Sequence, residues 1–425
     1  MSIVIRQTRT HILAPLVLVA SIASAAAADV ALPDPLRLAD VTSVALRNRA
    51  EVSAATAQAD ALAERPAIVS ALEDPMITTS IGYPDESMMG VDRRYDRSIS
   101  IEQRFPLSRV RSHRRAVALA DADRARARAD ATGLDVVLDA RRSFFMLLER
   151  RRMQRIVDEQ MALAEQLVSV AANRYASGTS TQADVLGAEV EVARLQAEQQ
   201  ALLAQIRGAE AMLNASMGRP ADAPIPALEH DPYLEEPASQ ADVLHQASTN
   251  RPELAAGSAE VNRAKAEVHV MRSMYRPMGM VSVGRASTMM TGDETMLMVG
   301  ISVPIWRNSL RSGVNEALAM QRMADADLIA MRSMVAGEAL AAREEVNAVQ
   351  TQARVLRAEV VPRAEAATEA ALASYASGQG TLIAVIESAR ALWDVQAEQI
   401  MVEAAVGEAW ANLDRATGTL REVSQ

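Results

Sequence analysis

Methionine is the residue type whose number and placement could most directly serve chemistry in this sequence. The chain has 22 methionines, and eight of them cluster in one short stretch. These are Met271, Met274, Met278, Met280, Met289, Met290, Met296 and Met298. Thioether sulfur is a soft ligand that prefers Cu(I) or Ag(I), so the adjacent pairs Met88–Met89 and Met289–Met290 are candidate soft-metal ligands. Methionine also fills irregular apolar gaps, and this second interpretation stays open.

Other side-chain patterns give no support for an enzyme or a resident cofactor. The sequence lacks a plausible Ser, His and Asp order, a glycine-rich phosphate loop and a His-Glu-x-x-His motif. Its lack of cysteine excludes disulfides, thiolate metal sites and a cysteine nucleophile. A formal net charge of −10 argues against a nucleic-acid partner. We therefore expect a protein without catalytic residues, without a cofactor and without a confident metal site.

A set of short motifs occurs twice in the same order. Tyr175-Ala-Ser-Gly178 recurs as Tyr375-Ala-Ser-Gly378. The other matching pairs are 48–52 with 250–254, 105–107 with 303–305, Thr181 with Thr381, and 196–199 with 396–399. The interval is far longer than the repeat of a solenoid. It predicts two internal repeats, 29–217 and 237–425, joined by a proline-rich linker at 218–236.

Each predicted repeat contains the same elements. A helical segment leads to two short stretches that alternate polar and apolar residues, as half-buried strands do. A proline closes the second strand, and a very long helical hairpin follows. The predicted helical segments are 36–72, 108–176 and 180–217 in the first repeat and 237–274, 310–376 and about 381–416 in the second. The predicted strands are 76–83, 97–107, 280–287 and 296–305.

The N-terminus predicts export. Arg6 and Arg9, an apolar stretch at 12–22 and three alanines before Asp29 have the pattern of a cleaved signal peptide over 1–28. No later apolar run reaches the roughly 18 residues of a transmembrane helix. Four strands per chain cannot close a barrel, and isolated hairpins are only marginally stable. Three chains would supply twelve strands, an even number as in bacterial outer-membrane barrels.

Together these features resemble the TolC family of outer-membrane efflux channels. The resemblance is carried by the two Tyr-x-x-Gly turns with their following helices (175–186 and 375–386), by Asn-Arg-Pro-Glu-Leu at 250–254, and by the prolines before the long helices. It implies a mainly α fold with a small β part. The family forms a homotrimer with a coiled-coil helical tunnel in the periplasm and a twelve-stranded β-barrel in outer-membrane lipid. The implied partners are an inner-membrane efflux pump and a periplasmic adaptor (membrane fusion protein).

In that family the two turns form the periplasmic tip, where the adaptor docks and the channel narrows. The resemblance implies the tip residues Tyr175, Gly178, Gly378 and Gly380. It also implies a partial periplasmic gate of Tyr375, Asp184 and Glu387, because Ala384 and Gly380 stand where the family's first acid and its arginine would be. Three copies of Glu387 in a narrow pore would favour cations. The alternative is that Glu387 is a solvated residue beside a coiled-coil seam.

The exported substrate has two candidate classes. Val303-Pro-Ile-Trp-Arg307 resembles heavy-metal efflux members of the family, and together with the methionines it favours metal cations such as copper or silver. A multidrug or organic-compound channel of the same family is the alternative. A periplasmic coiled-coil adaptor or a structural coiled coil fits less well, because neither needs two helical hairpins with proline-terminated strands.

Overall fold

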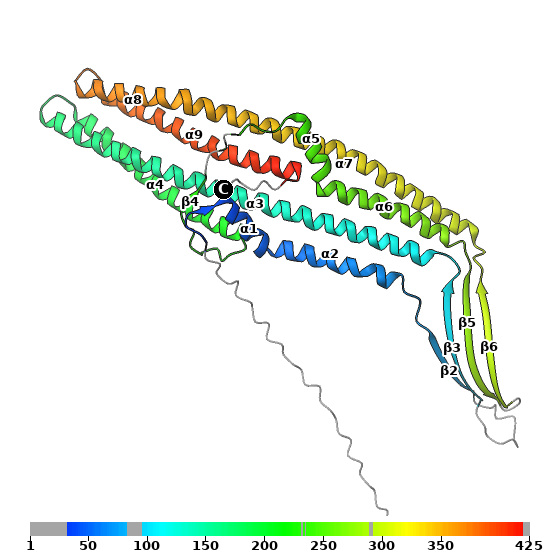
Figure 1. The fold of residues 1–425 in the computed structure, drawn as a ribbon. Coiled ribbons are helices and arrows are strands. Elements are labelled where there is room, and N and C mark those ends of the chain that lie inside the picture. The colour runs from blue at the N-terminus through cyan, green and yellow to red at the C-terminus, as the bar shows by residue number, and fades with distance from the viewer. Residues whose placement is uncertain (1–31, 83–95, 231–232, 234, 289–291, 420–425) are drawn as a thin grey trace, which may run out of the picture. The chain divides into compact units, whose positions relative to one another are not determined.

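The structure is a computed structural model that describes residues 32–82, 96–230, 233, 235–288 and 292–419, and most of these are helical (Figure 1). The predicted signal peptide lies outside the described residues. The helices are α1 (Leu38–Asn48), α2 (Ala50–Val69), α3 (Val110–Ala176), α4 (Gln182–Ser216), α5 (Gln240–Asn250), α6 (Pro252–Ser273), α7 (Arg307–Val355), a π-helix (Leu356–Val360), α8 (Val361–Ala376) and α9 (Leu382–Thr417). The strands are β1 (Leu36–Arg37), β2 (Met76–Gly82), β3 (Asp96–Pro106), β4 (Leu228–Glu229), β5 (Met278–Thr288) and β6 (Gly292–Ser302). The prediction of a mainly α chain with a small β part is confirmed.

The helix α3 is the element against which much of the chain packs. It has 67 residues without a proline, which corresponds to about 100 Å at the α-helical rise. It contacts α1, α2, α4, α6 and α9, so it joins elements from both halves of the chain. None of the described helices has an apolar run long enough to cross a membrane.

The two opening helical segments are each broken in the middle. Arg49 separates α1 from α2 and Arg251 separates α5 from α6, both in an extended conformation. Pro252 accounts for the second break, because a proline disfavours the helical conformation of the residue before it. Both arginines cap another helix: Arg49 Nη1 donates to the Ser216 carbonyl oxygen at 3.4 Å, and Arg251 Nη1 to the Ala416 carbonyl oxygen at 3.2 Å.

The expected uninterrupted helix at 310–376 is wrong at one place. The π-helix Leu356–Val360 separates α7 from α8, and Pro362 is the second residue after it. Proline has no backbone N–H to donate, and its ring clashes with the carbonyl group four residues earlier. The wider π-turn accommodates that ring without ending the helix.

The main sheet has the antiparallel strand order β2-β3-β5-β6 (Figure 1). Its central pairing joins the two halves of the chain, with Ile101 opposite Val283. The loop expected at 288–295 is shorter, because β5 and β6 stay paired as far as Thr288 and Gly292. Correspondingly, β6 ends at Ser302, so Pro304 lies beyond the strand, whereas Pro106 is the last residue of β3.

A second, small sheet was not predicted. β1 and β4 pair in parallel, with Leu36 opposite Leu228, and they fasten part of the segment between the halves beside α1. The core around it contains Phe144 and Phe145 of α3, while a neighbouring cluster contains Trp410 of α9. Partly buried Tyr233 packs against both clusters. These are the largest buried side chains, so the few core aromatics lie where the two halves meet.

Candidate functional site at the helix turns

The two Tyr-x-x-Gly turns have the same backbone geometry. Gly178 ends α3 with a φ of 73°, and Gly378 ends α8 with a φ of 81°. Their N–H groups donate to the carbonyl oxygens of Tyr175 at 3.0 Å and Tyr375 at 3.1 Å. A glycine is favoured at such a left-handed position because it has no Cβ to clash. The turns lie at the ends of α3 and α8, remote from the strands at the other end of α3 (Figure 1).

The helices after the turns begin with threonine caps. Thr181 Oγ1 accepts a hydrogen bond from the Asp184 N–H at 3.3 Å, and Thr381 Oγ1 accepts one from the Ala384 N–H at 3.2 Å. Asp184 completes a capping box by accepting from the Thr181 N–H at 3.0 Å. A hydrogen bond from the Ser180 hydroxyl, the one from Thr181 and the nearby charge of Arg174 hold the pKa of Asp184 below its usual value. The Asp184 carboxylate is therefore ionised, and its hydrogen bonds are made within its own turn.

The two tyrosines of the repeated motif have different environments. Tyr175 is 50% exposed, whereas Tyr375 is 2% exposed and packs with Leu167, Leu382 and Val385. The buried Tyr375 hydroxyl has no hydrogen-bond partner among the described residues. A buried polar group without a partner costs about 1–3 kcal/mol.

Arg174 joins the two turns, and sequence reasoning missed it. Its guanidinium carbon lies 4.5 Å from the centre of the Tyr375 ring, and Nη1 donates a hydrogen bond to the Tyr375 carbonyl oxygen. Nη2 also donates to the carbonyl oxygen of Thr179 in its own turn, at 3.4 Å. A sequence signal was available, because the position that holds Arg174 in the first turn holds Ser374 in the second.

A side chain on Gly380 would be crowded by the turn itself. A Cβ at this position would lie 3.0 Å from the backbone nitrogen of Tyr375 and 3.1 Å from the carbonyl carbon of Ser374. The Gly380 N–H donates to the Ser374 carbonyl oxygen at 2.9 Å. A larger residue at this position would require the neighbouring backbone to shift by a few tenths of an ångström, whereas Arg174 brings a guanidinium from the other turn.

Glu387 lies on the exposed side of α9 and forms no hydrogen bond or ion pair with the described residues. The adjacent Arg390 binds Glu191 of α4 through both Nε, at 3.2 Å, and Nη2. Arg194 Nη2 also donates to Glu191, at 2.8 Å. Burial alone would raise the pKa of Glu191, but the hydrogen bonds from Arg390 and Arg194 lower it. Arg390 is thus held by Glu191, while Glu387 stays exposed and contributes to the negative charge around Arg390.

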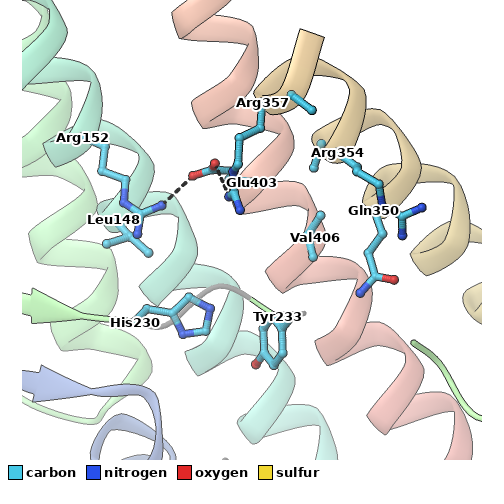
Figure 2. A pocket seen from close by; sticks show the side chains of 11 residues that line it. Leu148, Arg152, His230, Tyr233, Gln350, Arg354, Arg357, Glu403 and Val406 are labelled. Carbon is cyan, nitrogen blue, oxygen red and sulfur yellow. Dashed lines mark hydrogen bonds and ion pairs between the residues drawn. The ribbon is translucent and has the colours of Figure 1, made fainter. Parts of the chain in front are cut away.

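A second ion-pair network links the halves farther from the turns. Figure 2 shows Glu403 of α9 between Arg152 of α3 and Arg357 of the π-helix, at N–O distances of 3.0 Å and 2.6 Å. It lines a cavity of about 190 Å³ that His230 and Tyr233 also border. Burial would raise the pKa of Glu403, but hydrogen bonds from Arg357 and Gln399 lower it. These contacts place paired charges along the joint between the halves.

The candidate soft-metal ligands Met88, Met89, Met289 and Met290 lie outside the described residues. Four other methionines of the cluster lie on the strands β5 and β6, which the structure describes. Met278 and Met280 of β5 share one face with Met296 and Met298 of β6, because their register positions alternate in step. Among the described residues, no three His, Asp or Glu side chains group as a ligand set.

Comparison with known proteins decides the family. The model of the outer membrane efflux protein family matches residues 41–219 and 243–419, which is most of the chain. The chain belongs to the outer membrane efflux protein family. The resemblance to TolC-type channels is therefore confirmed. Outer membrane efflux proteins are passive conduits, so the chain is a channel protein and not an enzyme, and it belongs in the outer membrane.

Individual efflux proteins agree with the family match. The cobalt-zinc-cadmium resistance protein CzcC of Cupriavidus metallidurans is 26% identical over 303 residues, which cover 70% of this chain and 72% of CzcC. The channel CusC has a TM-score of 0.79 at 14% identity, covering 90% of this chain and 92% of its own. VceC of Vibrio cholerae has a TM-score of 0.74 at 16% identity, covering 90% and 96%. At these identities the two structures establish a shared fold.

Proposed function

We propose that three copies of this chain form an outer-membrane channel that passively conducts metal cations out of the cell. The observation that carries the proposal is the unequal chemistry of the two faces of the β2-β3-β5-β6 sheet. Side chains of a strand alternate between faces, and the register assigns every described strand residue to one of them. One face suits contact with lipid on the outside of a barrel, and the other suits its water-filled lumen.

One face is apolar. Its exposed members include Ile77, Ile81, Ile99, Ile101, Val283, Leu297, Val299 and Ile301. Such a face suits contact with lipid. The outer strands β2 and β6 each pair on one side only within the described residues. A strand edge cannot stay open inside a membrane, and two further copies would close both edges into a twelve-stranded barrel.

The other face combines methionine with small and polar residues. Met76, Met278, Met280, Met296 and Met298 share it with Ser98, Ser100, Ser282, Gly284, Gly300 and Ser302. In a closed barrel this face would line the lumen. Thioethers bind Cu(I) and Ag(I) weakly and reversibly when no thiolate or imidazole completes the set. A lumen of this kind could pass soft cations without retaining them.

The helix turns serve as the periplasmic gate and adaptor-docking tip in this proposal. Exposed Tyr175 and the turn glycines Gly178, Gly378 and Gly380 supply a surface for a periplasmic adaptor, which would connect the channel to an inner-membrane pump. Buried Tyr375, bound by Arg174, fixes the spacing of the two turns. Three exposed Glu387 carboxylates around a narrow opening would attract cations and repel anions.

Silver and copper tolerance tests the cargo. Cells without this channel should lose tolerance to Ag(I) and Cu(I), and the wild-type chain should restore it. A chain with Met280→Leu, Met296→Leu and Met298→Leu should reach the outer membrane as a trimer but restore tolerance only partly. Met320→Leu with Met323→Leu is the control, because these methionines, at 50% and 53%, are about as exposed as Met296 and Met298 but lie on α7.

Three results separate the candidate functions. Full tolerance with the triple variant would show that the strand methionines do not handle the metal. Lost tolerance to zinc, cobalt or cadmium alone would move the cargo to the metals named for CzcC. Normal metal tolerance with lost drug or dye tolerance would replace the proposal by the multidrug alternative.

A further inference from the structure

The junction between the strands and the long helices contains a cavity with an unusual charge. It has a volume of about 380 Å³ and is bordered by Leu107, Ser108, Arg109, His113, His269, Arg272, Ser273 and Arg276. No carboxylate is among these residues. All three arginines are exposed, and none of them forms an ion pair with the described residues, whereas Arg124 and Arg263 farther along α3 and α6 are both paired. The cavity therefore combines cationic groups that lack a counter-charge.

The histidine at the start of α3 responds to the positive charge of the cavity. His113 at the start of α3 stacks on His269 near the end of α6, with ring centres 5.3 Å apart and an angle of 21° between the planes. Partial burial, His269 and Arg109 together hold the pKa of His113 below its usual value. The first turn of α3 also has no acidic residue. An anion placed here would relieve the mutual repulsion of these groups.

The position of the cavity indicates the kind of anion. Leu107 follows β3 directly, and its N–H donates to the Pro277 carbonyl oxygen just before β5 at 3.2 Å. Partly exposed Tyr275 and fully exposed Trp306 (78%) lie at the same ends of the strands. Tyrosine and tryptophan concentrate at the borders of membrane barrels. If the strands cross the outer membrane as proposed above, the cavity lies at the height of the lipid headgroups.

We infer that this cavity binds a phosphate group and that its ligand is the headgroup of an anionic phospholipid. Arginine forks match phosphate oxygens with two parallel hydrogen bonds. Arg272 lies on the last turn of α6 and Arg276 just beyond its end, and both border the cavity, so both can face one phosphate. Arg109 approaches from α3. The site would fasten the strand–helix junction to the inner side of the membrane.

Binding of defined lipids to the detergent-solubilised trimer tests the inference by native mass spectrometry. The probe is phosphatidylglycerol, compared with zwitterionic phosphatidylcholine. Wild-type protein should prefer phosphatidylglycerol, and R272Q/R276Q should weaken its binding about tenfold or more, as expected for lost charge-assisted hydrogen bonds. The single variant R276Q should lie between them. R114Q/R115Q is the control: both arginines are exposed on α3, unpaired and outside the cavity.

Each outcome bears on the inference. Equal losses in R272Q/R276Q and R114Q/R115Q would reduce the effect to a general basic surface and overturn the site. Equal binding of both lipids, with inorganic phosphate binding as tightly as phosphatidylglycerol, would overturn the lipid assignment in favour of free phosphate. Single-channel conductance of the same variants should stay unchanged. A loss of lipid preference with intact conductance therefore leaves the proposed channel function untouched, whereas absent conductance in wild-type protein would refute the channel alone.

Discussion

The guanidinium of Arg174 lies 4.5 Å from the ring centre of Tyr375, although 201 positions separate the two residues. This contact fixes the turn after α3 against the turn after α8. An arginine over an aromatic face contributes about 0.5–2 kcal/mol, and the hydrogen bond to the Tyr375 carbonyl oxygen adds to it. The relative position of the two turns therefore depends strongly on one side chain.

Arg174→Gln should loosen the proposed gate. Loss of about 1–2 kcal/mol would raise the ratio of open to closed channel by about tenfold. Planar-bilayer recordings of the purified trimer would show this as more frequent opening. Arg363→Gln is the control, because Arg363 is 76% exposed and pairs only with the neighbouring Glu359. Identical traces for wild type and Arg174→Gln would mean that the contact does not restrain the opening.

Glu387→Ala should remove the proposed carboxylate ring. The channel should become less cation-selective, and block by trivalent cations from the periplasmic side should weaken by about tenfold or more, since three charges are lost per trimer. Reversal potentials in a salt gradient measure the first effect and dose–response curves the second. Glu365→Ala, an exposed carboxylate of α8, should change neither. Selectivity and block that persist in Glu387→Ala would identify Glu387 as a solvated helix residue.

Gly418→Ala should destabilise the chain. Gly418 has a φ of 69°, and a Cβ there would lie 2.7 Å from the Asn250 carbonyl oxygen. The left-handed conformation alone costs alanine about 1–2 kcal/mol. Gly187→Ala is the opposite case, because the Cβ meets no atom within 4 Å on α4 and alanine favours a helix by about 0.5–1 kcal/mol. The temperature at which heated trimers dissociate on a gel should fall for the first variant and rise slightly for the second.

Acid should weaken the joint between the halves at Glu403. Its folded pKa is lowered from 4.5, so its ion pairs stabilise the folded state fully above the pKa of the unfolded chain. That contribution is lost as the pH falls below about 4.5 towards the folded pKa. Glu403→Gln should therefore lower the unfolding temperature at pH 7 and lose most of that difference at strongly acidic pH. For exposed Glu369→Gln, calorimetry at both pH values should give the wild-type curve.

The fold was predictable where one residue type demands one local geometry. Gly178 and Gly378 predict the two turns, because a helix commonly ends at a residue in the left-handed conformation and glycine adopts that conformation at low cost. The alternation of polar and apolar residues predicted the two hairpins but not where their strands end. Strand β6 begins at Gly292, four residues before the predicted start, because strand pairing overrides the polar character of residues 293–295. The two-residue β1–β4 pairing is too short to leave a periodic signal.

The long-range side-chain contacts of the candidate site could not be predicted from the sequence. The sequence predicts both Tyr375 and Asp184 as gate residues. In the structure Tyr375 is buried beneath Arg174, and the Asp184 carboxylate accepts hydrogen bonds within its own helix cap. The sequence around each turn does not indicate which side chain of one turn contacts the other turn. Pro362 could have predicted the π-helix, because its missing N–H and its ring must be accommodated somewhere in the preceding turn.

That π-helix also changes how positions correspond between the halves. Pro106 and Tyr175 are 69 positions apart, whereas Pro304 and Tyr375 are 71 apart. A π-turn absorbs an additional residue without ending the helix, and each residue rotates the following side chains by about 100°. Positions that match by counting from the strands therefore point in other directions after Leu356. Any scan that transfers positions from α3 to α8 must count backwards from the turns instead.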